Sequence, residues 1–352
     1  MEHLYEYLVF LAEAITLVVV ILLIIGSIYS ASAKHSRPQA HLDVERVNDR
    51  LDDMQRSLKH AFMEEAEYKK FVRQEKKHDK AKQKQKKQQK TKSVEADAAP
   101  KPRLFVVDFH GDLQASRVDL LRNEITALLT EVKPEDEILV RIESAGGMVH
   151  GYGLAASQLH RIKNHGVRLV AAIDKVAASG GYLMAAVADH IISAPFAVVG
   201  SIGVVAQIPN VHRLLKKHDI DVEVLTAGEY KRTLTIFGEN TDADRQKFIE
   251  ELNDVHALFQ DFVTHNRSQV NIDEVATGEA WHGHRALEKK LVDELLTSDE
   301  YIMQACKDRD VFEVKWQPAR KPLEKLAARF TTAISQGVVG ALEKLGFNLE
   351  RR

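Results

Sequence analysis

Short apolar segments alternate with amphipathic helical segments between residues 103 and 225, and this alternation constrains the fold more than any other feature of the chain. An apolar run of four to six residues is typical of a strand buried on both faces. The predicted strands are Leu104–Phe109, Ile138–Glu143, Leu169–Ile173, Ile191–Ala194 and Val222–Leu225. The predicted helices between them are Val118–Thr130, Tyr152–Lys163, Gly181–Ala188 and Val211–Lys217. Strands that alternate with helices pair in parallel through crossover connections, so the pattern predicts an α/β fold.

Two helical segments follow this alternation. Asp242–His265 carries an apolar face, and residues 323–345 repeat large apolar side chains every four positions. We therefore place one folded domain at residues 103–310 and a helical tail at residues 311–352. The tail has no residue pattern that suggests chemistry, and we expect it to be a packing or assembly surface.

The N-terminal part of the chain begins with an apolar run of about 21 residues, Leu8–Ile28, which is long enough to span a bilayer as a helix. A cleaved secretory signal is the alternative, because Ala31-Ser32-Ala33 has the small-x-small form of a cleavage site. However, no Lys or Arg precedes the run, and it exceeds the roughly 7–15 apolar residues of a signal peptide. We predict an uncleaved, single-pass transmembrane anchor at residues 1–33. Lys34 and Arg37 favour a cytoplasmic domain, but long domains cross membranes regardless of charge, so the membrane face stays open.

Residues 34–102 are predicted to form a juxtamembrane helix and a basic linker. An apolar stripe with alternating spacings of three and four is formed by Val44, Val47, Leu51, Met54, Leu58 and Ala61. Such a helix packs on a partner helix, on its own protein or on the membrane surface. Residues 69–92 hold twelve Lys or Arg, although the chain as a whole carries 49 basic and 51 acidic residues, a net charge of −2. Since no aromatic residue lies between Phe71 and Pro102, this tract indicates a tether near anionic lipid and not a nucleic-acid site.

Cofactor chemistry has little support in the sequence. Cys306 is the only cysteine, so the chain has no intrachain disulfide, and no Cys/His cluster indicates structural zinc. None of the glycine-rich segments matches the dinucleotide spacing G-x-G-x-x-G or the P-loop. We therefore expect no metal and no cofactor.

Three glycine-centred segments lie where predicted strands end: Glu143–Gly147, Ala177–Tyr182 and Gly200–Gly203. Each of these segments could simply form a turn, with no role in chemistry. Ser179 differs from other serines because glycines hold its hydroxyl at the start of a predicted helix, where free backbone N–H groups stabilise negative charge. A nucleophile suits that position. The N–H of Gly180 would then hold an oxyanion, and the Gly146 and Gly147 pair offers a second donor.

A serine nucleophile needs a base, and the residues alone leave two alternatives. His110, His150 and His190 lie nearest to predicted strand ends and would complete a triad, although no signature such as G-x-S-x-G selects one of them. The other alternative is Lys231, in a loop after the last predicted strand, because burial lowers the pKa of a lysine and makes it a base.

The segments D-K-V-A-A-S-G-G-Y from Asp174, A-P-F-A-V-V-G-S-I-G-V from Ala194 and G-E-Y-K-R from Gly228 resemble the signal peptide peptidase A family of membrane-bound serine peptidases. The likeness runs from about Phe105 to Leu295, and the anchor and linker before it resemble the SohB branch. Departures are Ala145 where the family commonly has proline and Lys290 where it commonly has glycine. Neither departure touches the expected chemistry.

The resemblance implies a ClpP/crotonase-type βαβ spiral with Ser179 as nucleophile, Lys231 as general base and oxyanion donors at Gly180 and Gly147. Ser201 would orient the lysine, or be a turn hydroxyl. The implied activity is endoproteolysis of signal peptide remnants or other membrane-associated or unfolded peptides, at a bacterial inner membrane, by a homo-oligomeric ring. A crotonase-like acyl-CoA enzyme and a non-catalytic membrane scaffold are the alternatives.

Overall fold

The computed structural model describes residues 40–74, 77, 101–228 and 230–318, with scattered positions between Tyr7 and Val20. The predicted anchor lies almost wholly outside these residues, and the tail beyond residue 318 lies outside them altogether. Among the residues that are described, no helix combines the length and the apolar character that a membrane span requires. Apart from His41, Trp316 and Gln317, the residues described below belong to one compact unit, Leu42–Lys315.

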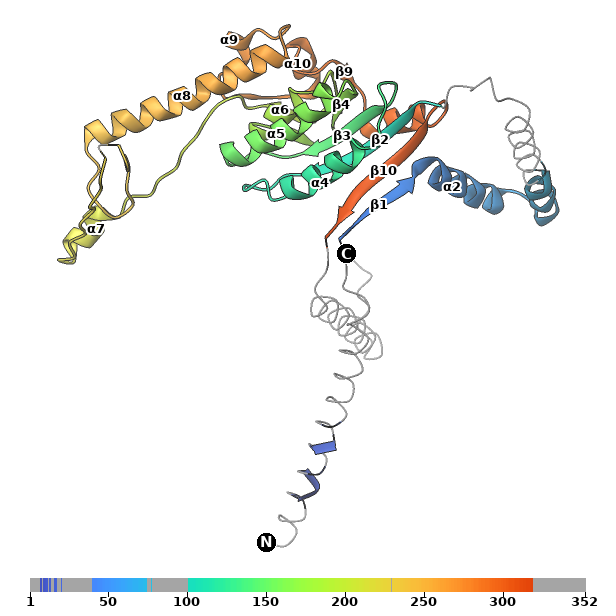
Figure 1. Cartoon of the computed structure of the whole chain (residues 1–352), viewed down its shortest axis with the longest axis horizontal. Helices are drawn as coiled ribbons and strands as arrows, with labels where there is room; N and C mark the ends of the chain where they lie inside the picture. Colours follow the sequence, from blue (N-terminus) through green and yellow to red (C-terminus); the bar gives the residue numbers. More distant parts are fainter. Residues whose placement is uncertain are drawn as a thin grey trace. The chain divides into compact units, whose positions relative to one another are not determined.

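Two β-sheets form the centre of this unit (Figure 1). The strand order of the larger sheet is β1, β10, β2, β3, β4, β6, β9, and all strand pairs from β10 to β9 are parallel. Its strands are β1 (His41–Arg46), β2 (Arg103–His110), β3 (Glu137–Glu143), β4 (Arg168–Ile173), β6 (His190–Ser193), β9 (Glu294–Leu295) and β10 (Asp310–Gln317). In the smaller sheet, β7 (Val198–Gly200) pairs in parallel with β5 (Val176–Ala178) and antiparallel with β8 (Ala280–His282).

Helices connect most of the parallel strands, as the sequence predicts. They are α2 (Val47–Phe62), α4 (Val118–Leu128), α5 (Val149–Asn164), α6 (Gly180–Ala185), α7 (His212–Lys217), α8 (Asp242–Asn266), α9 (Ile272–Val275), α10 (Gly283–Glu288) and α11 (Ser298–Ala305). The long helix α8 begins where Thr241 and Asp244 form a capping box. The mixed α/β fold, four of the five predicted strands and the five predicted helices of residues 118–265 are confirmed.

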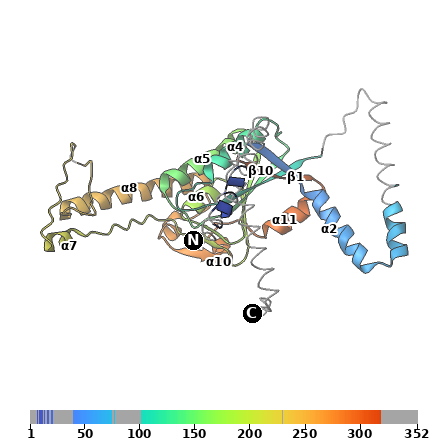
Figure 2. The same ribbon diagram turned by 90° about the horizontal axis from the view of Figure 1, so that it is seen from below.

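Both faces of the larger sheet are buried, which explains why its strands are continuous apolar runs. In β2, Phe105, Val107 and Phe109 join one core with residues of α4, α5, α6 and α8. Leu104 and Val106 point to the opposite face, where residues of α2 and α11 cover them. Figure 2 shows α4, α5 and α6 together on one side of the sheet, with α2 and α11 on the other.

The predicted strand Val222–Leu225 is wrong. This segment has no ladder partner and is exposed, with Leu225 at 88%. It belongs to residues 203–241, here named the arm, which leave the two sheets, include α7 and return at the start of α8 (Figure 1). Alternating β-branched residues favour an extended chain, but a strand also needs a neighbour with free backbone groups, and the arm reaches none.

The larger sheet extends beyond residues 103–310, because β1 precedes that range and β10 continues to Gln317. The predicted apolar stripe is divided between two environments. Val47 is buried against β2 and β10, and Leu51 packs beside it, so this half lies on the chain's own core. Met54 and Leu58, one and two turns further along α2, are more than half exposed.

Candidate active site

Ser179 occupies a one-residue turn between β5, which ends at Ala178, and α6, which begins at Gly180. Its backbone has φ 50° and ψ −118°, a conformation that a residue with a Cβ adopts only under strain. Its N–H donates a 2.7 Å hydrogen bond to the carbonyl oxygen of Gly200 at the end of β7. The side chain is half-buried. Two strands of the smaller sheet therefore hold a strained serine with its hydroxyl near the surface.

The glycine pair after β3 lies directly beside this serine. Ser144 joins the two segments, because its N–H donates to Val176 and its carbonyl accepts from Ala178. Gly146 has φ 91°, and a Cβ built there would lie 2.7 Å from the Cβ of Ser179. Gly146, the third residue after Glu143, is thus brought to the nucleophile across a gap of more than thirty residues in sequence.

The backbone N–H groups at this junction differ in their availability. The N–H of Gly146 donates to Ser144 Oγ at 3.1 Å, so it is already used. The N–H groups of Gly147 and Gly180 have no hydrogen-bond partner among the described residues. Of the three predicted oxyanion residues, Gly147 and Gly180 therefore have a donor free for a ligand, and Gly146 does not.

Ser201 also lies next to this turn. It follows Gly200, which accepts the Ser179 N–H, and it has φ 52°. Its own N–H donates to the carbonyl oxygen of Glu279 at 2.6 Å, which ties it to the segment before β8. In the smaller sheet, the neighbouring strands β5 and β7 are thus each followed by a serine with positive φ, Ser179 and Ser201.

Lys231 is not near this cluster within one chain. It is exposed and lies in the arm, where its N–H donates to Gly228 in a turn with φ 101°. The neighbouring Tyr230 ring lies 4.9 Å from Lys247 Nζ, close to the start of α8. The helix α8 joins the core that also contains α6 at Val263. Val263 lies sixteen residues after Lys247, which corresponds to about 24 Å along the helix. Figures 1 and 2 show the arm at this distant end of α8.

The three histidines of the triad alternative have other surroundings. His190 stands at the start of β6 beside Asp293 and Glu294. His110 lies 3.7 Å from Glu143, and His150 is exposed in the first turn of α5. Across residues 101–228 and 230–318, no histidine hydrogen-bonds to Ser179.

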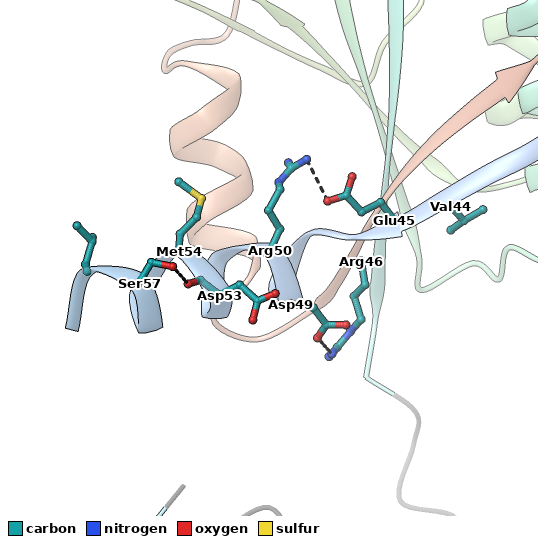
Figure 3. A pocket seen from close by; sticks show the side chains of 9 residues that line it. Val44, Glu45, Arg46, Asp49, Arg50, Asp53, Met54 and Ser57 are labelled. Atoms are coloured by element: carbon teal, nitrogen blue, oxygen red, sulfur yellow. Dashed lines mark hydrogen bonds and ion pairs between the residues drawn. The ribbon is translucent and has the colours of Figure 1, made fainter. Parts of the chain in front are cut away.

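An open groove of about 800 Å³ lies elsewhere, between β1 and α2 (Figure 3). In the groove, Arg46 pairs with Asp49 at 2.6 Å, and Ser57 Oγ donates to the backbone carbonyl oxygen of Asp53 at 2.9 Å. These polar groups of the groove are therefore already engaged with one another. The groove contains none of the predicted site residues. Within the described part of the chain, no cluster of three His, Cys, Asp or Glu residues could hold a metal ion.

Ser144 and Tyr152 are two site neighbours that the sequence did not single out. Ser144 Oγ lies 2.5 Å from the Tyr152 hydroxyl, directly behind the glycine pair. The available signals were weak: a serine one residue beyond a strand, and a tyrosine in a helix that begins after two glycines.

Comparison with known proteins assigns the family. The model described as "Peptidase family S49 N-terminal" matches residues 2–159, and the one described as "Peptidase family S49" matches residues 161–312. The probable protease SohB of Haemophilus influenzae is 47% identical over 319 residues, which is 91% of this chain and 90% of that protein. The probable protease SohB of Buchnera aphidicola subsp. Schlechtendalia chinensis is 45% identical over 303 residues, 86% of this chain and 99% of that protein.

Among solved structures, a mutant of the 1510-N membrane-bound stomatin-specific protease in complex with a substrate peptide aligns with a TM-score of 0.38 at 14% identity. The alignment covers 66% of this chain and 100% of that one. The family models and the curated relatives confirm the resemblance inferred from the motifs around Ser179 and Lys231. The chain is a member of peptidase family S49, a family of proteases.

Proposed function

We propose that the chain is a membrane-anchored serine endopeptidase with Ser179 as nucleophile and Lys231 as general base. The observation that carries this proposal is the strained turn at Ser179, which lies beside the unpartnered N–H groups of Gly147 and Gly180. Strain at one polar residue, next to two free donors, is typical of an acyl-transfer site. The fold supports it as well, since two sheets linked by βα units are compatible with a βαβ spiral.

The proposed reaction proceeds through an acyl-enzyme. Neutral Lys231 accepts the proton of Ser179 Oγ, which attacks the scissile carbonyl carbon, and the N–H groups of Gly147 and Gly180 hold the oxyanion. The Lys231 ammonium returns its proton to the departing amine. Lys231 then accepts a proton from water, whose oxygen attacks the carbonyl carbon of the Ser179 ester. The bond from that carbon to Ser179 Oγ breaks, the Lys231 ammonium gives its proton to Ser179 Oγ, and the new carboxyl end of the peptide is released.

We propose that Lys231 comes from a second copy of the chain. Within one copy the arm holds Lys231 far from Ser179. The arm also exposes apolar side chains that a partner surface would cover, among them Val205 at 91%, Ile220 at 50% and Leu225 at 88%. A contact in which the arm of one copy reaches the turn of the next is heterologous, and heterologous contacts generate a ring where the rotation between copies closes.

Mixing two inactive variants tests this arrangement. Ser179→Ala and Lys231→Ala are each expected to abolish hydrolysis of a denatured protein substrate. When the two are mixed as monomers and reassembled, about one quarter of the sites pair an intact Ser179 with an intact neighbouring Lys231 if the dyad crosses between copies. Recovery of about that fraction of wild-type activity supports the proposal. A mixture that stays inactive, while separated wild-type copies recover after the same treatment, contradicts it.

The remaining features of the proposal have separate tests. Ser201 is proposed to orient Lys231, and Ser201→Ala is then expected to lower kcat about tenfold. The anchor at residues 1–33 and the basic linker are proposed to hold the enzyme on a bacterial inner membrane. Deletion of residues 1–39, followed by a high-salt wash that screens the linker charges, should then release it from sedimented membranes. Signal peptide remnants, or other membrane-associated or unfolded peptides, are the proposed substrates. Labelling of Ser179 by a fluorophosphonate separates this reaction from an acyl-CoA reaction and from a scaffold.

A further inference from the structure

Tyr152 lies behind the candidate oxyanion site with its hydroxyl group fully engaged. The residue belongs to α5 and is completely buried. Its hydroxyl lies 2.7 Å from the carbonyl oxygen of Asp112 and 2.5 Å from Ser144 Oγ. Ser144 Oγ in turn lies 3.1 Å from the backbone nitrogen of Gly146. Four groups from three segments of the chain therefore form one continuous hydrogen-bonded series.

The direction of each hydrogen bond follows from the number of protons. The Asp112 carbonyl can only accept, so the single hydroxyl proton of Tyr152 is donated to it. Ser144 must then donate its own proton to the oxygen of Tyr152. One of the two lone pairs of Ser144 Oγ accepts the N–H of Gly146. Each of the three protons in the series is donated to one acceptor, and the loss of the Tyr152 hydroxyl or of Ser144 Oγ leaves a polar group beside the glycine pair unpaired.

The ring of Tyr152 also touches the other half of the site. A Cβ built on Gly180 would meet Tyr152 Cγ at 2.4 Å, so the ring packs directly against the backbone that carries the Gly180 N–H. A Cβ built on Gly111 would meet the Tyr152 hydroxyl and Ser144 Oγ, each at 2.4 Å. Tyr152 thus contacts the helix start by its ring and the glycine pair through Ser144.

We infer that Tyr152 and Ser144 are positioning residues that set the geometry of the oxyanion site. Glycine residues impose little restriction on their own φ and ψ, so the Gly146–Gly147 segment needs an outside restraint to aim its second N–H. The hydrogen bond from Gly146 to Ser144 supplies that restraint, and Tyr152 fixes the rotamer of Ser144. This inference rests on the proposed function, because it assigns a purpose to the Gly147 N–H.

Burial raises the pKa of Tyr152 above its ordinary value, and this effect outweighs the opposing hydrogen bond from Ser144. The hydroxyl therefore keeps its proton throughout the neutral and mildly basic range. The series does not titrate under working conditions. Breaking it is therefore expected to lower the rate by the same factor at every pH and to leave the shape and position of the pH–rate profile unchanged.

The test compares two buried tyrosines in the full-length protein. Tyr152→Phe and Ser144→Ala each break the series, and the double variant breaks it twice. The matched control is Tyr182→Phe: Tyr182 is also fully buried and donates to a backbone carbonyl, that of Leu291, at 2.9 Å, away from the glycine pair. Hydrolysis of a chromogenic peptide gives kcat and KM, and thermal unfolding gives Tm for every variant. Ser179→Ala is measured alongside.

We expect Tyr152→Phe and Ser144→Ala each to lower kcat about 10- to 100-fold with KM nearly constant, since a displaced donor weakens only transition-state binding. The double variant should lose little more than the worse single variant, because both act through one restraint. Tyr182→Phe should lower Tm at least as much and leave kcat within about twofold of wild type.

Two results overturn the inference: Tyr152→Phe as active as Tyr182→Phe, or a double variant whose loss equals the product of the single losses. The failure of the proposed function is a different result, namely a Ser179→Ala variant that still hydrolyses the peptide.

Discussion

The backbone N–H of Ser179 is hydrogen-bonded to the carbonyl oxygen of Gly200 at 2.7 Å, so the candidate nucleophile is fixed to the end of a strand in the smaller sheet. Gly200 itself has φ 102° and lies against Trp281, whose ring would be 2.8 Å from a Cβ at this position. The nucleophile therefore depends on a glycine 21 residues further along the chain.

Gly200→Ala is expected to lower both stability and activity. The new Cβ would meet the Trp281 ring and would stand on a backbone with positive φ, which together destabilise the fold by about 2–3 kcal/mol. Urea unfolding measures the free energy, and peptide hydrolysis measures the activity. Gly153→Ala is the control, because it is a helical glycine with open space around it, and it should raise stability by about 0.5–1 kcal/mol with unchanged activity. Equal stability of the two variants would contradict the packing argument.

The strain at Ser179 predicts an order of stability among inactive variants. Glycine accepts φ 50° and ψ −118° without a steric penalty, whereas alanine keeps the Cβ. Ser179→Gly should therefore be more stable than Ser179→Ala by about 1 kcal/mol, despite the greater chain entropy of glycine in the unfolded state. Chemical denaturation of both variants checks the order. An alanine variant at least as stable as the glycine variant would show that the turn stores no strain.

Residues of α2 contribute to the stability of the peptidase domain. Val47 is 2% exposed against β2 and β10, and Asn48 accepts the N–H of Val311 and donates to the carbonyl of Arg309. Val47→Ala should lower the free energy of unfolding by about 2 kcal/mol. Leu58→Ala, on the exposed half of the same helix, should change it by less than about 0.5 kcal/mol.

The folded domain depends on β1 and α2, which limits where the chain can be cut. A fragment that starts at residue 103 loses β1 and α2 and exposes the apolar face of β2 to water. We expect it to have a lower Tm than a fragment that starts at residue 40, or to aggregate. Equal Tm values for the two fragments would mean that α2 is not part of the folded unit.

Acid should destabilise the fold through the Arg267–Asp293 ion pair. Burial alone would raise the pKa of Asp293, but hydrogen bonds from Arg267 and from the Ile191 N–H outweigh it and hold the pKa below its ordinary value. A folded-state pKa that is lowered stabilises the protein above the unfolded pKa, near 4, and this contribution is lost as pH falls through the folded value. Stability measured from pH 7 to pH 3 should therefore fall more steeply in wild type than in Asp293→Asn.

Asp293→Asn is also expected to lower the free energy of unfolding at neutral pH. Arg267 is 2% exposed, so Asp293→Asn leaves a buried guanidinium without its carboxylate and should cost about 3 kcal/mol. Glu288→Gln breaks the exposed Arg285–Glu288 pair and should leave the unfolding midpoint unchanged. Equal effects of the two substitutions would be inconsistent with the burial of Arg267.

Local patterns predicted β2, β3, β4 and β6 because each is an apolar run buried on both faces. The same patterns missed β10, whose alternation is interrupted by Glu313 and Lys315. These two charges are satisfied by residues far away in sequence, Arg50 and Arg141 for Glu313 and Asp108 for Lys315. A strand with paired charges on one face resembles a surface segment until its partners are known.

The sequence by itself determined the α/β fold, the serine held by glycines between strand and helix, and the family, because these depend on neighbours within a few residues of each other. Only the tertiary structure decided which backbone N–H groups at the site are free, that Tyr152 and Ser144 lie behind Gly146, and that Lys231 lies at the far end of α8. These facts depend on contacts between segments that are distant in sequence. Residue patterns record which faces become buried, but they do not record which distant segment covers them.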